Sequence, residues 1–296
     1  MPEPAVIVEP LPDARAFLAT VGPYLERREA EHNLLFGIAG NLIKDPARRM
    51  TAPPFFAAIR RGGGGGNGEV VGGALMTPPF NIVLSCIDDE AAWSALLDHL
   101  VAERVRIPGV TAPAELARAF CEAYAARHGL KAERTMAERI YRLEHVTPPV
   151  GVPGTMRLGT TADRDLLVDW ADAFLAEALD RRDPEEPAEL VDSALRSGTR
   201  LFYLWEHEGR PVSMAGVTGP TPHGIRVGPV YTPPADRGHG FASAVTAAAS
   251  QEQLDQGRSF VFLFTDIHNP TSNKIYQAIG YEPVIDIDQW TLAPRR

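Results

Sequence analysis

The segment SFVFLFTDI constrains the fold most, because five apolar residues run without a break from Phe260 to Phe264. Such a run is typical of a strand that is covered on both faces. An alanine-rich, helix-like segment, FASAVTAAASQEQLDQG, precedes it, and a strand-like segment, GIRVGPVYT, precedes that helix. Strand, helix and strand in this order predict a right-handed crossover between two parallel strands. The C-terminal half is therefore expected to hold a sheet flanked by helices.

The segments around this crossover follow a definite order. Residues 160–179 have the apolar periodicity of a helix, and a shorter acidic helix is expected within 186–196. Two strands, RLFYLWEHEG and PVSMAGVTG, are expected to form a hairpin around Glu208-Gly209-Arg210. After the apolar strand, TSNKIYQAIG predicts a short helix that ends at Gly280, and YEPVIDIDQWTL closes the chain. The predicted order is α-α-β-β-β-α-β-α-β.

The turn that opens the crossover helix contains Arg237-Gly238-His239-Gly240. Glycine permits positive φ and close approach of a ligand, and the free amides at a helix N-terminus attract anions. Ala242 is small for the same reason, and Arg237 can add a charge-assisted contact to a phosphate. Two glycines alone are also compatible with a plain turn. The turn therefore predicts an anion site only in its strand–helix context.

In that context Arg237-Gly238-His239-Gly240-Phe241-Ala242 resembles the acyl-CoA motif of the GNAT superfamily of N-acetyltransferases, Arg/Gln-x-x-Gly-x-Gly/Ala. The segment NPTSNKIYQAIGYEPV at 269–284 resembles a second signature of that family. A dinucleotide site of the Rossmann type is disfavoured, because the third glycine and the following acidic strand end are both missing. The resemblance implies an N-acetyltransferase that moves an acetyl group from acetyl-CoA to the amine of a small molecule, by direct attack in a ternary complex. A non-catalytic acyl-CoA sensor is the alternative.

The resemblance also implies which residues bind the coenzyme. They are Val230, Tyr231, Thr232, Arg237, Gly238, His239, Gly240, Phe241, Ala242, Asn269 and Asn273. The pantetheine would lie in a gap between residues 230–232 and 260–265, where the amides of Val230 and Thr232 can polarise the thioester carbonyl. Pro229 fits a bulge at this gap because it cannot donate to a ladder, although an ordinary kinked strand accounts for the same residues.

The remaining chemistry is a proton donor and a base. Tyr276 matches the family's acid, which protonates the leaving thiolate, and this role is favoured over the alternative of a tyrosine that only packs its helix onto the sheet. Asn269 and Asn273 can cap the same helix instead of touching coenzyme. The base that deprotonates the amine is unassigned, and no metal site is expected. The candidates for the base are Asp266, His268, His223 and Tyr231.

Two other stretches invite a functional interpretation. The glycine-rich RRGGGGGNGEVVGG at 60–73 is followed by a strand-like segment and not by Gly-Lys-Ser/Thr and a helix, so a hairpin tip is expected and not a phosphate loop. The acidic EALDRRDPEEPAELVD includes Glu177, Asp180 and Glu185. These carboxylates either attract a cationic amine or form a solvated acidic face.

Residues 1–147 resemble, in the order of their elements, the first part of a tandem GNAT protein. Helices are expected in 12–40, and a hairpin around the glycine run, a strand, two more helices and a final strand follow. Where the second half has its glycine turn, this half has Cys86-Ile87-Asp88-Asp89-Glu90. Three carboxylates stabilise a helix N-terminus but repel a diphosphate. This half is therefore expected to be degenerate and non-catalytic.

The seam VTPPVGVPGT separates the halves. We predict a degenerate GNAT-like domain in 1–147 and a GNAT acetyltransferase domain that binds acyl-CoA in 152–296. The fold class is α/β (α+β): two tandem GNAT-like domains, each a mixed, mostly antiparallel sheet with a central parallel strand pair flanked by helices.

Composition limits the partners. With 29 basic and 38 acidic residues the net charge is −9, which argues against a nucleic-acid partner. No apolar run of about 18 residues and no signal-like N-terminus occur, so neither a membrane nor secretion is expected. The only cysteines, Cys86 and Cys121, are far apart, which favours a reducing cytoplasm. The expected partners are acetyl-CoA and a small amine, and the oligomeric state stays open, a homodimer included.

Overall fold

The computed structural model describes residues 5–44, 52–62, 68–179 and 185–295. They form two compact units. Unit 1 comprises Met1–Ile140, Asp266–His268 and Val284–Arg296, and unit 2 comprises Tyr141–Thr265 and Asn269–Pro283. The chain first passes from unit 1 to unit 2 between Ile140 and Tyr141. The C-terminal strand belongs to unit 1, whereas the sequence assigned it to the second domain.

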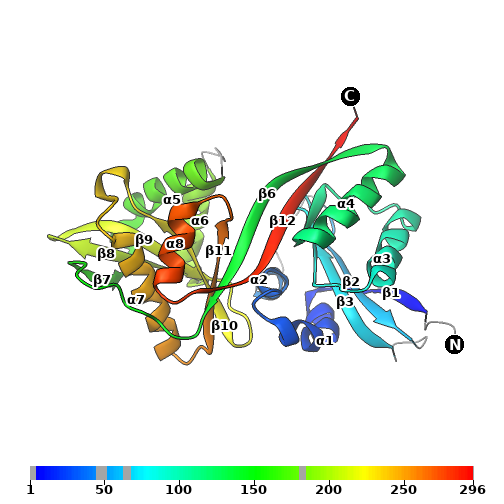
Figure 1. Cartoon of the computed structure of the whole chain (residues 1–296), viewed down its shortest axis with the longest axis horizontal. Coiled ribbons are helices and arrows are strands. Elements are labelled where there is room, and N and C mark those ends of the chain that lie inside the picture. Colours follow the sequence, from blue (N-terminus) through cyan, green and yellow to red (C-terminus); the bar gives the residue numbers. More distant parts are fainter. Residues whose placement is uncertain (1–4, 45–51, 63–67, 180–184, 296) are drawn as a thin grey trace. The chain divides into compact units, whose positions relative to one another are not determined.

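Unit 1 is a mixed sheet with helices on both faces (Figure 1). Its elements are β1 (Val6–Pro10), α1 (Ala14–Leu25), η1 (Glu26–Arg28), α2 (Asn33–Lys44), β2 (Phe55–Arg61), β3 (Glu69–Met76), β4 (Ile82–Leu84), α3 (Glu90–Ala102), β5 (Gly109–Pro113), α4 (Ala114–His128), most of β6 (Leu130–Leu143) and β12 (Glu282–Pro294). The strand order is β1-β2-β3-β4-β5-β12-β6, and β4 and β5 are parallel. One hydrophobic cluster lies under α1 and α2 and another under α3 and α4.

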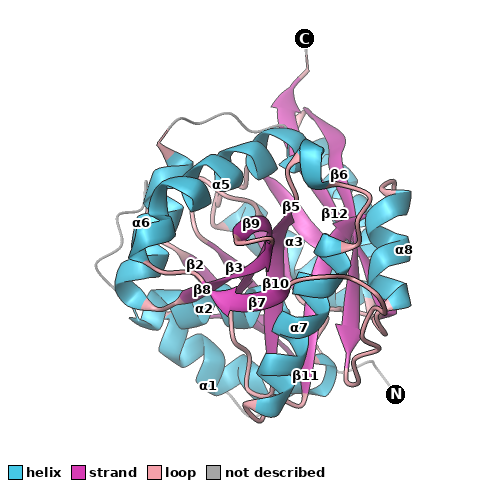
Figure 2. Ribbon diagram, turned by 90° about the vertical axis from the view of Figure 1, so that its left-hand side faces the viewer, coloured by secondary structure: helices cyan, strands magenta, loops and turns pink. Residues whose placement is uncertain are grey.

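Unit 2 repeats this plan; Figure 2 distinguishes its cyan helices from its magenta strands. Its elements are β7 (Thr155–Leu158), η2 (Thr161–Asp163), α5 (Arg164–Leu179), α6 (Glu186–Ser197), β8 (Arg200–His207), β9 (Arg210–Thr218), β10 (Gly224–Tyr231), η3 (Pro234–Asp236), α7 (Phe241–Asp255), β11 (Phe260–Asp266) and α8 (Pro270–Ala278). The strand order within the unit is β11-β10-β9-β8-β7, and β10 and β11 are parallel. The apolar side chains of α5 and α6 join the cluster on one face, and those of α7 the cluster on the other.

The fold class is confirmed, and so are the main elements of the second half. Phe260 to Leu263 are at most 4% exposed, as the unbroken apolar run predicts. The hairpin between β8 and β9 turns at Glu208 and Gly209, whose φ values are 51° and 75°. Positive φ at both central residues is typical of the type I′ turn that suits a two-residue hairpin.

The sequence prediction missed three short strands. β1 and β7 have no alternation of buried and exposed residues, and β5 is buried along most of its length. All three contain five residues or fewer, and such short segments carry little periodicity from which a strand can be recognised.

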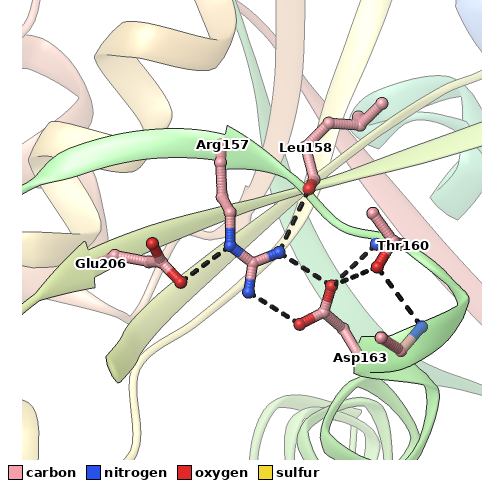
Figure 3. Close-up of polar contacts among 6 residues, drawn as sticks. Arg157, Leu158, Thr160, Asp163 and Glu206 are labelled. Carbon is pink, nitrogen blue, oxygen red and sulfur yellow. Dashed lines mark hydrogen bonds and ion pairs between the residues drawn. The ribbon is translucent and has the colours of Figure 1, made fainter. Parts of the chain in front are cut away.

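Arg157 on β7 fixes the start of α5 (Figure 3). Its guanidinium donates to both carboxylate oxygens of Asp163, at 2.7 and 2.8 Å, and to Glu206 on β8 at 2.7 Å. Asp163 and Thr160 form a capping box at the same turn. The hydrogen bonds from Arg157 hold the pKa of Asp163 well below its ordinary value. β7 therefore anchors the helix that carries Glu177.

Replacing glycine by alanine should have opposite effects on the stability of unit 1 at two positions. At Gly73 on β3 a Cβ would lie 2.5 Å from Cγ1 of Val21, whereas at Gly22 within α1 it meets nothing within 4 Å. Gly73→Ala should destabilise by about 1–3 kcal/mol through overpacking. Gly22→Ala should be neutral or stabilise by about 0.5–1 kcal/mol, because alanine favours a helix interior. Urea unfolding of both variants measures this, and equal effects would contradict it.

Candidate functional site

β10 separates from β11 after a short parallel pairing. Gly224–Arg226 pair with Phe260–Phe262, and beyond them the register of β10 against β9 shifts between Val227 and Val230. Gly228 lies in this bulge with a φ of 143°, a conformation that glycine tolerates. Bulges bend a strand and interrupt its pairing. The bulge that Pro229 suggests is therefore present, at the place where the sequence predicts the pantetheine gap.

The turn after β10 exposes the N-terminus of α7. Gly238 and Gly240 have φ values of 82° and 81°, so both use the left-handed conformation. Gly240 is the N-cap residue of α7 and supplies no side chain to cap it. A Cβ on Gly240 would lie 2.9 Å from Cγ2 of Val152. The first-turn amides are thus left without a side-chain cap, as an anion site at a helix N-terminus requires.

An ion pair between the buried Asp236 and the largely exposed Arg210 holds this turn. The carboxylate of Asp236, whose side chain is 9% exposed, accepts from Arg210 at 2.6 and 3.0 Å. These hydrogen bonds lower the pKa of Asp236. Nδ1 of His239 lies 3.2 Å from the carbonyl oxygen of Asp236, and the His239 ring stacks on Phe241 at 5.5 Å. The turn is therefore built around Asp236.

Arg237 is engaged with the first helix of unit 2. Its Nη2 donates to Glu177 at 2.6 Å and its Nε to the carbonyl oxygen of Thr232 at 2.9 Å. The hydroxyl of Tyr231 donates to the same Glu177 at 3.2 Å. Burial, followed by the charge on Glu177, raises the pKa of Tyr231. A contact between Arg237 and a phosphate stays a prediction, and Nη1 takes part in neither of these two hydrogen bonds.

The two asparagines cap and brace α8. Oδ1 of Asn269 accepts from the amide of Ser272 at 3.0 Å, so Asn269 is the N-cap residue. Nδ2 of Asn273 donates to the carbonyl oxygen of Asn269 at 2.8 Å, and its Oδ1 accepts from the buried Tyr141 hydroxyl at 3.0 Å. The capping alternative describes Asn269, and coenzyme contacts of both residues stay predictions.

Tyr276 lies on the inner side of α8. It packs against the hydrophobic cluster that also receives Val230, and its ring meets Tyr281 edge-on at 6.0 Å. Burial raises the pKa of Tyr276 to about 12, so the phenol is protonated at neutral pH. No hydrogen bond joins its hydroxyl to another residue in the described part of the chain. These features are compatible with a proton donor and with a packing role.

The four candidate bases are divided between the two units. Asp266 and His268 belong to unit 1, where Oδ1 of Asp266 accepts from the His268 amide at 2.8 Å. Tyr231 and His223 lie at opposite ends of β10. Within the described ranges no group of three or more histidine, cysteine or acidic side chains is arranged to hold a metal ion, and no helix has the length and apolarity to cross a membrane.

Some contacts of this site carry no signal in the sequence. Arg210 occupies a hairpin end, where an arginine is unremarkable, and its link to Asp236 spans β9 and the turn. Arg200 begins β8 and reaches the bulge of β10. The sequence shows Glu177 only as one carboxylate of an acidic stretch, and its contacts with Tyr231 and Arg237 carry no signal there; Asp180, in the same stretch, lies outside the described residues. Only the three-dimensional fold brings these side chains to the motif.

The corresponding position of unit 1 is closed by its own residues. Asp89 caps α3, since its Oδ1 accepts from the Ala91 amide at 2.9 Å, and Arg61 pairs with it. The amide of Cys86 donates to Nε2 of His32 at 3.0 Å, and Nδ1 of His32 lies 2.9 Å from the carbonyl oxygen of Leu25. This position therefore has a carboxylate cap where α7 has none.

The second half matches a known family. Residues 165–281 match the sequence profile of the Acetyltransferase (GNAT) family, a range that contains both the glycine turn and α8. Among curated proteins no relative is found.

Solved structures share the fold over the whole chain. A Drosophila protein has a TM-score of 0.65 at 14% identity and covers 98% of this chain and 99% of its own. A GCN5-related N-acetyltransferase from Sphaerobacter thermophilus has a TM-score of 0.60 at 14% identity, covering 98% and 96%. A tandem GNAT protein from the clavulanic acid biosynthesis pathway has a TM-score of 0.55 at 15% identity, covering 98% and 99%. The chain has the tandem GNAT fold.

His32 should make unit 1 sensitive to acid. Because the Cys86 amide donates to Nε2, the proton is on Nδ1 and the ring is neutral; burial lowers its pKa. This stabilisation should be complete above the ordinary pKa of about 6.5 and be lost as pH falls through the folded value. Tm measured from pH 8 to 5 should fall less steeply in His32→Gln than in wild type. The control is exposed His128→Gln, and the same slope in all three proteins would contradict the assignment.

Proposed function

We propose that this chain, whose residues 165–281 form a domain of the GNAT family, transfers an acetyl group from acetyl-CoA to the amine of a small molecule. Acyl transfer is the chemistry of that family. The finer assignments, namely the acetyl donor, the small acceptor and direct attack in a ternary complex, rest on the arrangement of unit 2.

The proposal rests on two neighbouring features of unit 2: β10 stops pairing with β11, and the N-terminus of α7 that follows has no side-chain cap. β10 leaves β11 after Arg226, and the turn that follows presents the first amides of α7 with Gly238 and Gly240 in left-handed conformations. A strand gap suits the linear pantetheine, whereas a helix N-terminus suits its diphosphate. Both features follow one another along one strand, so a single extended ligand can use both.

The chemistry needs few groups. The neutral amine attacks the thioester carbonyl carbon, the C–S bond breaks, and the thiolate takes a proton. Tyr276 supplies this proton in the proposal, and the amides of Val230 and Thr232 stabilise the developing oxyanion. The attacking nitrogen gives up its own proton to a base or to water. Positioning of the two reactants supplies most of the acceleration.

Unit 1 is proposed to be non-catalytic. Its counterpart of the glycine turn carries Asp88, Asp89 and Glu90, and Asp89 already caps α3. Adding a diphosphate there would displace this cap and bring like charges together. Unit 1 would then support unit 2 or contribute to acceptor selection, and acetyl-CoA should bind with one site per chain.

A thiol-release assay with acetyl-CoA over a panel of amines, amino acids, aminoglycosides and peptides tests the function. Turnover on any member supports the transferase. Binding of acetyl-CoA by calorimetry without turnover on any member would favour the acyl-CoA sensor instead, and absence of binding would overturn both.

The diphosphate site can be tested without straining the turn. Gly240 is a poor site for substitution because of its positive φ and the nearby Val152. Ala242 lies in the first turn of α7, and its backbone is helical. Ala242→Glu should weaken acetyl-CoA binding about ten-fold or more, through charge repulsion, while the helix dipole keeps Tm unchanged or raises it. The isosteric Ala242→Gln is the control. If Ala242→Glu binds acetyl-CoA as tightly as wild type does in calorimetry, the site is refuted.

The acid is tested by Tyr276→Phe. The proposal expects kcat to fall by about 10²-fold or more, the lower range of general-acid effects, with coenzyme affinity nearly intact. Tyr281→Phe is the matched control, because Tyr281 is buried beside Tyr276 and donates or accepts at Ser250, 2.8 Å away. It should lower Tm, because a buried hydrogen bond to Ser250 is lost, and leave kcat within about two-fold. Unchanged kcat in Tyr276→Phe would return Tyr276 to packing alone.

A further inference from the structure

We propose that Arg200 is a positioning residue for the gap between β10 and β11 in which the coenzyme would lie. It donates a hydrogen bond to the carbonyl oxygen of Gly228 and so stabilises the bulge of β10, and this bulge keeps β10 apart from β11. The proposal rests on the proposed function for its catalytic meaning, and on the geometry of β8, β9 and β10 for the hydrogen bond itself.

The contact between Arg200 and Gly228 is a side-chain hydrogen bond that is not part of the backbone pairing between strands. Nη1 of Arg200, the first residue of β8, donates to the carbonyl oxygen of Gly228 at 3.0 Å. Between β8 and β10 lies β9, whose Thr218 is the register partner of both Arg200 and Arg226. The arginine therefore extends over the neighbouring strand to reach the bulge. A charge-assisted hydrogen bond of this kind is stronger than one between neutral groups.

The other side of the bulge is held by contact. A Cβ on Gly216 of β9 would lie 2.8 Å from the oxygen of Gly228 and 2.9 Å from Cδ of Pro229. Glycine at position 216 is thus what allows the bulged backbone to approach β9 so closely. Arg200 and Gly216 both act on the peptide group of Gly228. Arg200 donates a hydrogen bond to its oxygen, and Gly216 has no Cβ that would clash with it.

The charge of Arg200 has no carboxylate partner among the described residues, and the residue is partly buried. Burial, with the nearby charge of Arg226, lowers the pKa of Arg200 to about 10, so it stays protonated at neutral pH. A cation with reduced access to water is costly, and its hydrogen bond to the Gly228 carbonyl and its position 6.0 Å from the centroid of the Phe202 ring compensate part of this cost. This arrangement adds little net stability but fixes the direction of one carbonyl.

The direction of that carbonyl matters because the bulge determines where pairing with β11 stops. Released from Arg200, the segment Val227–Val230 can take more regular strand conformations and pair further along β11. The gap would then narrow before the amide of Val230 is reached. Arg200 would act through the backbone and would not touch the coenzyme.

The test uses Arg200→Met, which keeps the stem and removes the donor, and Arg200→Lys, which keeps one donor. Arg258→Met is the matched control, since Arg258 also donates to a carbonyl of unit 2, that of Thr221 at 3.4 Å. Gly216→Ala disturbs the bulge from the opposite side. Each full-length variant is measured for amide hydrogen exchange in 224–232, for Tm, for acetyl-CoA affinity by calorimetry, and for the KM of acetyl-CoA and kcat.

We expect faster exchange at Val227–Tyr231 in Arg200→Met and Gly216→Ala but not in Arg258→Met. Acetyl-CoA affinity should fall and its KM rise about ten-fold in both, roughly the effect of one charge-assisted hydrogen bond. Arg200→Lys should recover most of this loss. A fall in Tm with unchanged affinity and KM in Arg200→Met would mean a purely structural role and overturn the proposal.

The two proposals fail separately. If wild type does not bind acetyl-CoA, the proposed function is wrong, and the exchange data alone decide whether Arg200 holds the bulge. If wild type binds and Arg200→Met leaves both the exchange rates and the affinity unchanged, the role of Arg200 is refuted while the acetyltransferase assignment stands. Should Gly216→Ala fail to fold, the comparison of Arg200→Met with Arg200→Lys still gives the answer.

Discussion

The separation of two parallel strands is the constraint on which the rest of unit 2 depends. β10 and β11 must pair to close the sheet, yet they pair through three residues each before β10 bulges at Gly228. Because the bulge turns the strand end away, the following turn can present the N-terminus of α7 beside the gap. Asp236 and Arg210 then fix that turn with two hydrogen bonds. The position of α7 therefore depends on the turn that precedes it, and the position of that turn depends on the bulge of β10.

Unit 1 has the same order of strand, helix and parallel strand, but a carboxylate caps its helix and the N-terminus is not available to an anion. There β4 and β5 also run parallel over a short register, with Ile82 and Val83 opposite Val110 and Thr111. The helix that follows begins with an aspartate cap where α7 has an uncapped glycine turn. Helix electrostatics is identical in both units, since it comes from the backbone. What differs is whether a side-chain carboxylate already uses it, and this decides which N-terminus stays available to an anionic ligand.

Local patterns account for what the sequence could predict. The apolar run at Phe260–Phe264, the glycine turn and the stop at Gly280 each combine composition with spacing, and the corresponding elements are present. The contacts of Arg200 and Arg237 were not predictable, because each depends on which side chain a neighbouring strand or helix brings into reach. The roles of Tyr276 and the base stay open for a related reason: position on a helix does not specify what a hydroxyl will donate to.

The place of β12 in unit 1 has a consequence for how the chain matures. β12 pairs with β5, so that Gln289 lies opposite Thr111 although most of the chain separates them. During synthesis β5 emerges long before its partner, and the whole of β7 to α8 must be made in between. Such a long-range contact closes late and slowly. Until then β5 presents an unpaired edge, the kind of surface that invites pairing with another chain. Synthesis of unit 1 therefore begins before that of unit 2 but ends after it. Between the synthesis of β5 and that of β12, the unpaired edge of β5 makes unit 1 most prone to aggregation.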